Sequence, residues 1–296
     1  MRFGLHTGQH QVSFGELRAL WRDAAAWGFD ACYLFDHVVP LYSDVEGFLP
    51  EEASTADGPC LEGSTALARA VPSVNVGLMV AGVGYRSASY LAHVTATIAR
   101  AAPGRLEIGV GAGWFEPDYR ILGVPFDPPR VRLDAVERAV ALLRTAPEPP
   151  RLWIAGTGER RTIPMAARLA DAWNAMYLTP AEFARKVSVL EESCAAAGRD
   201  PLAVERSIAL RAFCAPARPD AVRALEGWAR SRGRDVQRLA ERSLVGTPEQ
   251  CAEQLRRYVI AGANHVAVMA HPPYDRAGLE LLATEGFALV GGNPRP

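Results

Sequence analysis

The residues best suited to chemistry follow short apolar runs. The run 106–111 leads into two small residues, Ala112 and Gly113, and then into an aromatic and charged cluster that begins at Trp114. Small residues let a flat ligand approach the backbone, because little or no Cβ stands in the way. We interpret this stretch as a buried strand whose C-terminal end leads into a functional site. The alternative is a tight strand-to-helix turn without a ligand.

A second apolar run, 31–35, ends in Asp36 and His37. An imidazole exchanges a proton near neutral pH, and a neighbouring carboxylate accepts hydrogen bonds from a ligand. Adjacent strand residues point to opposite faces, so the two side chains share a site only where the strand ends. His37 is our candidate for proton transfer, with Glu116 or Tyr85 as a substitute. The alternative is a histidine that only completes a turn.

A third apolar run, 152–155, is followed by a glycine-rich turn and two arginines. Bare backbone N–H groups, a hydroxyl and the positive end of a helix dipole together form a cradle for a phosphate, to which the arginines add charge. A lone GxG is also typical of an ordinary turn. The candidate cradle comprises Gly156, Thr157, Gly158, Arg160, Arg161 and Thr162.

The elements that must position these residues repeat along the whole chain. Apolar runs alternate with amphipathic helical patterns, which predicts parallel β/α units, and about eight units close a (β/α)8 TIM barrel. The expected strands are 3–6, 31–35, 74–80, 106–111, 152–155, 172–176, 207–214 and 265–270. Strand C-termini gather at one face of such a barrel, so the candidates should meet there. We expect one α/β domain over 1–290 and a flexible tail over 291–296.

Two segments stand apart from the β/α pattern. Residues 40–63 form a long polar loop with several acids, and such loops are usually functional lids or interface elements. Residues 216–242 are rich in arginine and poor in apolar residues, which indicates a solvated helical face. Thr247, with Gln250 three residues later, predicts the start of the next helix.

Composition excludes several classes of protein. The 296 residues are 49% hydrophobic and carry a net charge of -1, which allows a large core and gives no basic surface for nucleic acid. No apolar run approaches the roughly 18 residues of a membrane span, and the first residues are strand-like and lack the pattern of a signal peptide. The scattered cysteines and histidines give no disulfide or metal spacing. We expect a cytoplasmic protein without metal, nucleic-acid or membrane partners.

Taken together, several segments resemble the luciferase-like flavin and deazaflavin oxidoreductase family, most closely its F420-dependent branch. The segments are GFDACYLFDHVVPLY, DGPCLEGSTALA, GLMVAGVGYRS, GRLEIGVGAGWFEPDYRILGVPF, GTGERRT with LADAWN, and SLVGTPEQCAEQLRRYVIAGANHV. They cover most of the chain in the order the family has them. The resemblance implies a luciferase-like barrel, usually a homodimer, with the cofactor ring across the strand C-termini.

The resemblance also implies roles for particular residues. The family's Asp-His pair falls on Asp36 and His37, near the reactive centre of the ring, and its non-prolyl cis peptide falls within two residues of Met79 and Val80. Flavin-using members can carry an arginine where this chain has Ala112, so the alanine favours coenzyme F420 over FMN. Further cofactor contacts fall on Gly111, Ala112, Gly113 and the cradle from Gly156 to Thr162.

Two departures from the family limit this transfer. The segment LLRTAPEPPRLWIAG is shorter than usual, which indicates either a reduced lid that admits a larger substrate or a trimmed surface loop. Ser87 stands where many relatives have histidine, so any role of that histidine is lost.

The sequence therefore predicts an F420-dependent oxidoreductase that transfers hydride between reduced deazaflavin and a small organic substrate with an activated C=C or C=N bond. His6, Tyr85, Trp114 and Tyr177 are expected to line the substrate side. One alternative is an FMN-dependent luciferase-like monooxygenase. Another is a barrel that binds a cofactor or metabolite without chemistry.

Overall fold

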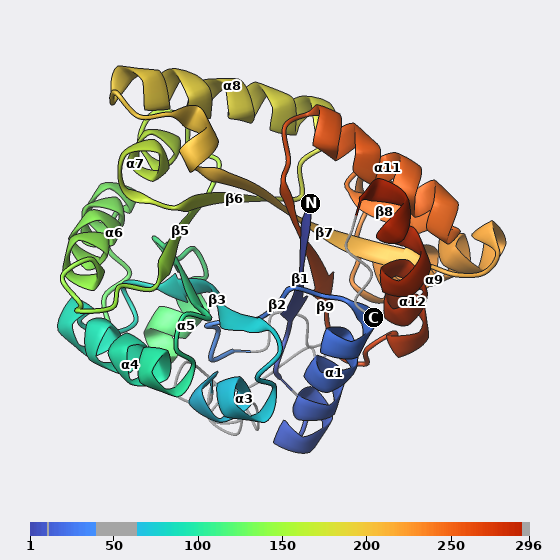
Figure 1. Ribbon diagram of the computed structural model, residues 1–296, viewed down its shortest axis with the longest axis horizontal. Helices are drawn as coiled ribbons and strands as arrows, with labels where there is room; N and C mark the ends of the chain where they lie inside the picture. The colour runs from blue at the N-terminus through green and yellow to red at the C-terminus, as the bar shows by residue number, and fades with distance from the viewer. Residues whose placement is uncertain (11, 40–63, 292–296) are drawn as a thin grey trace.

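A closed ring of parallel strands, surrounded by helices, forms the centre of the protein (Figure 1). The computed structural model describes residues 1–10, 12–39 and 64–291. The ring consists of β1 (Arg2–Thr7), β2 (Ala31–Leu34), β3 (Asn75–Gly82), β4 (Leu106–Gly111), β5 (Arg151–Ala155), β6 (Ala172–Met176), β7 (Glu205–Cys214) and β9 (His265–Ala270). Neighbours pair in chain order, and β9 closes the ring between β7 and β1. This confirms the predicted (β/α)8 TIM barrel.

The helices pack outside the ring on the stripes that their sequence periodicity indicates. In α1, the buried residues Leu17, Leu20, Trp21 and Ala24 recur with the period of a helix. Thr247 and Gln250 form the predicted capping box at the start of α11. The helices around the ring are α1 (Phe14–Trp27), α3 (Ser64–Ala70), α4 (Ala88–Ala101), α5 (Glu116–Ile121), α6 (Pro129–Leu143), α7 (Thr162–Leu169), α8 (Pro180–Ala196), α11 (Pro248–Ile260) and α12 (Arg276–Leu281), with short turns η1 (Pro201–Ala203), η2 (Leu282–Gly286) and η3 (Ala288–Val290).

One further strand, β8 (Ser243–Gly246), is missing from the sequence-based expectation. The first half of β7 pairs with β9, and its last residues, from Arg211 to Cys214, pair with β8. Before β8 come α9 (Arg218–Ser231) and α10 (Val236–Ala240). The arginine-rich stretch is therefore helical as expected, but α9 also buries Leu225 against Phe213 and Val245. It forms a small extension of the barrel.

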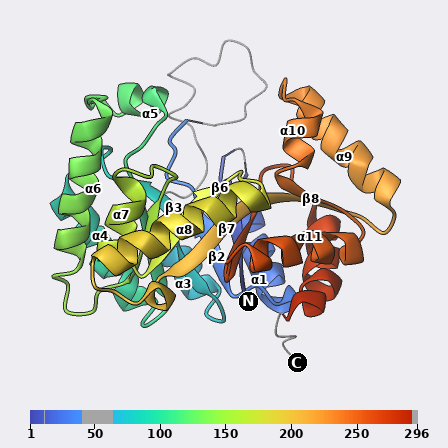
Figure 2. The ribbon, with the colours of Figure 1, turned by 90° about the horizontal axis from the view of Figure 1, so that it is seen from above.

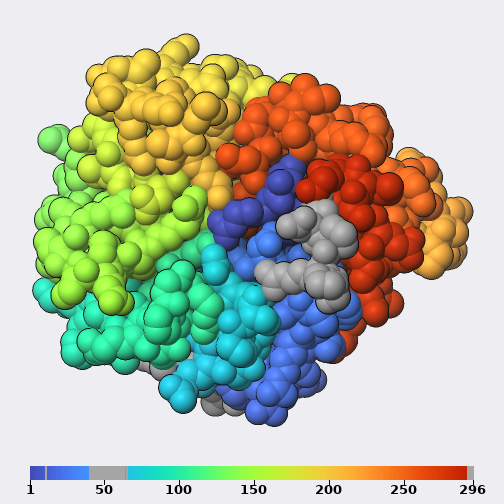
Figure 3. All heavy atoms as spheres, in the orientation of Figure 1, coloured from blue at the N-terminus to red at the C-terminus, as the bar shows by residue number. Residues whose placement is uncertain are grey.

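A polar network fills the barrel where the strands begin. Arg2 bonds to both Glu107 and Glu205, with shortest distances of 2.5 and 3.0 Å. The Glu107 carboxylate also accepts hydrogen bonds from the Tyr33 hydroxyl and the Asn75 amide, each at 2.6 Å. A buried carboxylate needs such partners. In Figure 3 the first residues of the chain, in dark blue, fill the centre of this face.

At the opposite end of the barrel the strands finish, and we call this end the mouth. Figure 2 shows α5 on one side of the mouth and α9 with α10 on the other, with the N-terminus at the far end. The expected loop 40–63 and residues 292–296 of the expected tail lie outside the described residues. In the described part of the chain no helix is long and apolar enough to cross a membrane.

Candidate functional site

A histidine-carboxylate pair lies at the mouth between the end of β2 and the first turn of α5. The Nδ1 atom of His37 is 2.5 Å from Oδ2 of Asp118. The buried Asp118 carboxylate also accepts the backbone N–H groups of Val38 and Val39 at 3.0 Å and the Tyr85 hydroxyl at 2.8 Å. Four donors therefore fix this carboxylate, and the carboxylate fixes the imidazole.

The pair leaves one ring nitrogen of His37 available for chemistry. With Nδ1 bonded to Asp118, the Nε2 atom is the one that can accept or donate a proton. The His37 side chain is 16% exposed. The rings of Trp114 and Phe115 both lie 5.9 Å from the imidazole, and Trp114 is 67% exposed. Trp114 therefore stands beside His37, where a substrate wall is expected.

The two predicted substitutes for His37 occupy different positions. Glu116 is exposed on α5 and faces Arg120 at 3.7 Å, so the acid that contacts His37 is Asp118, which the prediction leaves out. Tyr85 is buried, and its hydroxyl donates to Asp118. Burial, and then the charge of Asp118, raise the pKa of Tyr85 well above its usual value. Tyr85 therefore stays protonated and orients the pair.

Asp36 diverges from His37 and points toward the end of β3. Its carboxylate makes a bidentate ion pair with Arg86 at 2.6 and 2.8 Å and accepts the backbone N–H of Gly82 at 2.9 Å. Burial raises the pKa of Asp36, and the bonds from Arg86 oppose that rise. Asp36 thus ties β2 to the loop after β3, which the sequence-based prediction does not anticipate.

The predicted non-prolyl cis peptide is present between Met79 and Val80. The β3–β4 register shifts there, between Leu78 and Ala81. A Cβ atom at Gly111 would lie 2.8 Å from a methyl of Val80, so the glycine makes room for this side chain. The small residue in β4 therefore serves the packing of β3.

Gly113 serves the protein's own packing in the same way. Its φ is 69°, and an added Cβ would collide with the hydroxyl of Tyr119. That hydroxyl donates to the Ala112 carbonyl at 3.0 Å, and Arg132 donates to the Gly113 carbonyl. The sequence-based interpretation assigns these small residues to a ligand, but in the structure the space at Gly113 is taken by the Tyr119 hydroxyl. Ala112 is half-buried.

The predicted phosphate cradle lies between β5 and α7. Gly156 has a φ of 131°, and both Gly156 and Gly158 lie against Thr162, the first residue of α7. Thr157 is half-buried in the same turn. Arg161 pairs with Asp134 at 2.6 Å.

Arg160 is the remaining cation of the cradle. It is exposed, and within the described ranges it has no hydrogen bond or ion pair. Glu159 beside it pairs with Lys186 at 2.7 Å. Arg160 and the N-terminus of α7 are therefore the groups best placed to hold an anion here.

The substrate-side candidates His6 and Tyr177 lie at the ends of β1 and β6. His6 is 2% exposed, and neither ring nitrogen has a hydrogen-bond partner of normal geometry in the described structure. Burial lowers the pKa of His6 to about 3. Tyr177 has a φ of 55° and accepts a hydrogen bond from Arg211 at 3.1 Å. Arg211 also contacts Nδ1 of His271 at 2.9 Å.

Sequence reasoning misses Asp118, Arg211 and His271, and it includes Arg86 only as the end of the candidate segment 80–86 without a role. A weak signal exists for Arg211, because it is the charged residue inside the otherwise apolar run SIALRAFC. Asp118 belongs to the cluster after β4, but nothing in the sequence distinguishes it from Glu116. No three histidine, cysteine or acidic side chains of the described chain are grouped as a metal site would require.

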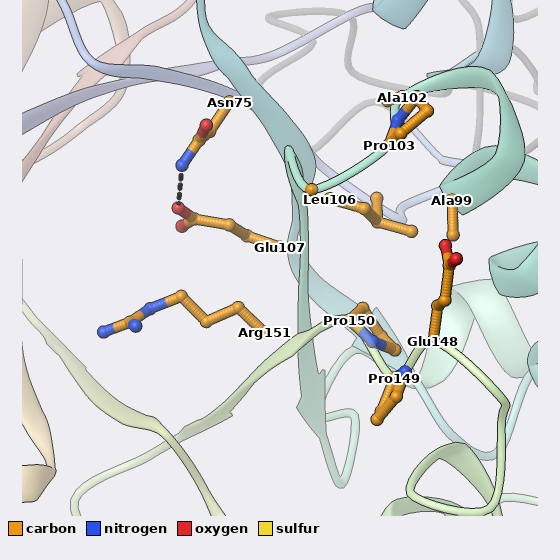
Figure 4. A pocket seen from close by; sticks show the side chains of 11 residues that line it. Asn75, Ala99, Ala102, Pro103, Leu106, Glu107, Glu148, Pro149, Pro150 and Arg151 are labelled. Carbon is orange, nitrogen blue, oxygen red and sulfur yellow. Dashed lines mark hydrogen bonds between the residues drawn. The ribbon is translucent and has the colours of Figure 1, made fainter.

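A hollow of about 430 Å³ lies at the end of the barrel opposite the mouth. Figure 4 shows Asn75, Glu107 and Arg151 on one side of it and Glu148, from the connection between α6 and β5, on another. The short segment before β5 therefore borders the face where strands begin. This corrects the reduced-lid interpretation and favours a trimmed surface loop.

Comparisons with solved structures find the same fold at low sequence identity. An F420-dependent secondary alcohol dehydrogenase, in complex with an F420-acetone adduct, has a TM-score of 0.82 and 18% identity, covering 98% of each chain. The coenzyme F420-dependent tetrahydromethanopterin reductase of Methanopyrus kandleri has a TM-score of 0.75 and 15% identity, covering 97% of this chain and 98% of its own. The monooxygenase RslO1 of Streptomyces bottropensis has a TM-score of 0.76 and 17% identity, covering 96% and 98%.

A comparison with curated protein sequences finds no match. The luciferase-like monooxygenase family matches residues 1–237, which include the His37–Asp118 pair and the cis peptide. Membership of this family supports an oxidoreductase. By this match, together with its barrel, the chain belongs to the luciferase-like monooxygenase family.

Proposed function

We propose that this protein is an F420-dependent oxidoreductase that transfers hydride between reduced deazaflavin and a small organic substrate, most simply one with an activated C=C or C=N bond. The observation that carries the proposal is the hydrogen-bonded pair of His37 and Asp118 at the mouth, where Tyr85 holds the carboxylate. Reduction of a polarised double bond needs a proton at the atom that does not receive the hydride. His37 is placed to provide it.

The residues at the mouth fit a deazaflavin. Arg160, the hydroxyl of Thr157 and the start of α7 suit a phosphate at the end of β5. Ala112 brings no charge to the loop after β4, in agreement with F420 over FMN. His6 has no ring hydrogen bond of normal geometry to the described residues, so its imidazole can offer a polar contact to a bound ring.

When bound, reduced F420 would supply hydride as a two-electron unit, and oxidised F420 would accept it in the reverse direction. His37 donates or accepts the proton at Nε2, and Asp118 stabilises the charged imidazole that results in the oxidative direction. Trp114 and Phe115 flank His37 and give the substrate an aromatic surface beside it. Arg86 and Asp36 keep the end of β3 in place beside them.

Cofactor titration tests this proposal. Apo protein is titrated with F420 and with FMN, and F420 is expected to bind more tightly. Arg160→Gln should weaken F420 binding by about ten-fold, as expected for a charge-assisted contact to phosphate. The neighbouring Arg161→Gln is the matched control and should change binding less, because Arg161 is held by Asp134. Micromolar FMN binding without F420 binding would overturn the proposal.

A flavin-dependent monooxygenase is the second candidate. The family match and the similarity to RslO1 favour it. The two candidates differ in their need for oxygen: the monooxygenase requires oxygen for product, and the deazaflavin enzyme turns over in its absence. Turnover of a substrate panel under anaerobic conditions distinguishes them.

A further inference from the structure

A group of cationic and aromatic side chains lies at the mouth, outside the histidine-carboxylate pair. It combines Tyr177 after β6, Arg211 of β7, Trp228 of α9, Arg232 and His271, and we call it the arginine cluster. The cluster joins the ends of β6, β7 and β9 to the α9 extension, which Figure 2 shows rising beside the mouth.

Arg211 is a buried cation at the centre of this cluster. It is 4% exposed, and its guanidinium lies 3.9 Å from the ring centroid of Trp228. Its Nη1 contacts Nδ1 of His271 at 2.9 Å, and its Nη2 donates to the Tyr177 hydroxyl at 3.1 Å. Arg211 can only donate, so Nδ1 of His271 accepts and that imidazole is neutral. Burial, followed by the charge of Arg211, lowers the pKa of His271 well below its usual value.

Arg232 brings a second cation to the same ring. Its guanidinium lies 4.8 Å from the Trp228 centroid, and Nη1 donates to the Ser231 hydroxyl at 2.8 Å. Its Nε atom is buried and, in the described structure, lacks a hydrogen-bond partner. A buried N–H of this kind is costly unless an acceptor completes it.

Two further features of this side of the mouth point to a bound group. His6 is buried, and in the described structure neither ring nitrogen has a hydrogen bond of normal geometry, although the Met79 backbone is close enough to affect its pKa. His6 is also close enough to Arg211 and His271 for their charges to interact. Tyr177 is the one non-glycine residue with positive φ among those described. Such backbone outliers concentrate at ligand sites.

We propose that the arginine cluster binds the carboxylate or phosphate of the substrate, so that the enzyme acts on organic anions. Guanidinium groups recognise such anions by charge-assisted hydrogen bonds, and the rings of Trp228 and Tyr177 suit a flat apolar body next to the anion. This inference rests on the proposed function and deepens it by naming the substrate class.

The position of the cluster assigns it to the substrate and not to the cofactor phosphate. The phosphate cradle follows β5, and the cis peptide lies in β3. The arginine cluster is built from β6, β7 and β9, and β7 and β9 continue the ring toward β1, on the other side of the mouth from β3 and β4. An anion held here leaves the rest of the molecule directed toward the centre of the mouth.

Calorimetric titration of the F420-loaded protein with benzoate, phenyl phosphate and neutral benzamide tests the inference. At least one anion is expected to bind about ten-fold more tightly than benzamide, and Arg232→Gln should abolish that preference. Arg232→Lys, which keeps the charge but removes Nε–H, should retain part of it. The matched control is Arg238→Gln on the exposed face of α10, which should change nothing. Benzoate and phenyl phosphate together tell which anion the cluster prefers.

The same samples separate this inference from the proposed function. The affinity for F420 should be equal in wild type, Arg232→Gln and Arg238→Gln. If F420 fails to bind the wild type while the apo protein still prefers anions to benzamide, the proposed function is wrong and the anion site stands. If benzamide binds as tightly as both anions, or Arg232→Gln keeps the preference, the anion site is wrong whatever the cofactor.

Discussion

At the scale of single residues, the site depends on a carboxylate that is far from its histidine in sequence. His37 and Asp118 are 81 positions apart, and the fold brings Nδ1 and Oδ2 to 2.5 Å. Glu116 and Asp118 are two positions apart on one short helix, so their side chains point to different sides. Glu116 reaches the surface, and Asp118 is fully buried.

Replacement of Asp118 tests its role in positioning His37. Asp118→Asn retains an oxygen for the N–H groups of Val38 and Val39 but removes the charge beside the imidazole. We expect kcat to fall by about 10²-fold, within the range of general acid-base catalysis, while the Kd for F420 is unchanged. Steady-state kinetics and F420 titration measure both.

The control for this substitution is Asp127→Asn, an exposed carboxylate between α5 and α6. It should leave kcat unchanged. Equal kcat in wild type and Asp118→Asn would contradict a role for the pair in proton transfer. A change in Tm alone would show that Asp118 only supports the loop.

Substitutions at two glycines distinguish the cost of a left-handed backbone from the cost of a steric clash. Gly113 and Gly123 have similar φ values of 69° and 66°, but only an added Cβ at Gly113 meets Tyr119. Gly123→Ala should cost about 1 kcal/mol of unfolding free energy through the left-handed backbone alone. Gly113→Ala should cost about 2 kcal/mol more, because Tyr119 must move. Urea unfolding of both variants checks the difference, and equal losses would contradict the packing role of Gly113.

At the scale of elements, the buried Arg86–Asp36 pair joins the ends of β2 and β3. Breaking a buried ion pair leaves an uncompensated charge, so Arg86→Met should lower the unfolding free energy by about 3–5 kcal/mol. Arg120→Met breaks the exposed pair with Glu116 and should cost less than about 1 kcal/mol. Chemical denaturation of the two variants makes the comparison.

A second substitution distinguishes the lost charge pair from lost packing. Adding Asp36→Asn to Arg86→Met removes the stranded carboxylate and should recover part of the stability. No recovery in the double variant would mean that Arg86 acts mainly through the packing of its side chain.

Strand and helix order could be predicted, but β8 and the partners within the site could not. The barrel strands are apolar runs bounded by turns, which makes them visible in the sequence. β8 has four residues, Ser243–Gly246, and pairs with the end of β7 only because β7 leaves β9 there. The bonds of Asp118, Arg86 and Arg211 join segments far apart in the chain, and no local pattern specifies such contacts.

At the scale of the whole molecule, buried histidines make the fold sensitive to acid. Burial is the largest cause that lowers the pKa of His6, His265 and His271. In the native state they stay neutral, and in the unfolded chain they bind protons below about pH 6.5. The stability they contribute is therefore present above that pH and is lost as the pH falls, by about 1.4 kcal/mol per pH unit for each histidine.

Removing one of these histidines should flatten the acid dependence. His265→Gln is expected to reduce the slope of unfolding free energy between about pH 6 and pH 4.5 by about 1.4 kcal/mol per unit. The exposed His93→Gln on α4 is the control. Denaturant unfolding across this range gives the slopes, and an unchanged slope in His265→Gln would contradict the prediction.

A homodimer and a cytoplasmic location remain predictions at this scale.

The bonds of Arg2 have a consequence for how the chain is made. Arg2 pairs with Glu107 and Glu205, which lie 105 and 203 positions later. During synthesis its first partner leaves the ribosome long before the second, and β9, which closes the ring beside β1, comes later still. The sheet therefore stays open, with its apolar strands exposed to aggregation, for most of translation. We expect chaperones to bind mainly to nascent chains that end before β9.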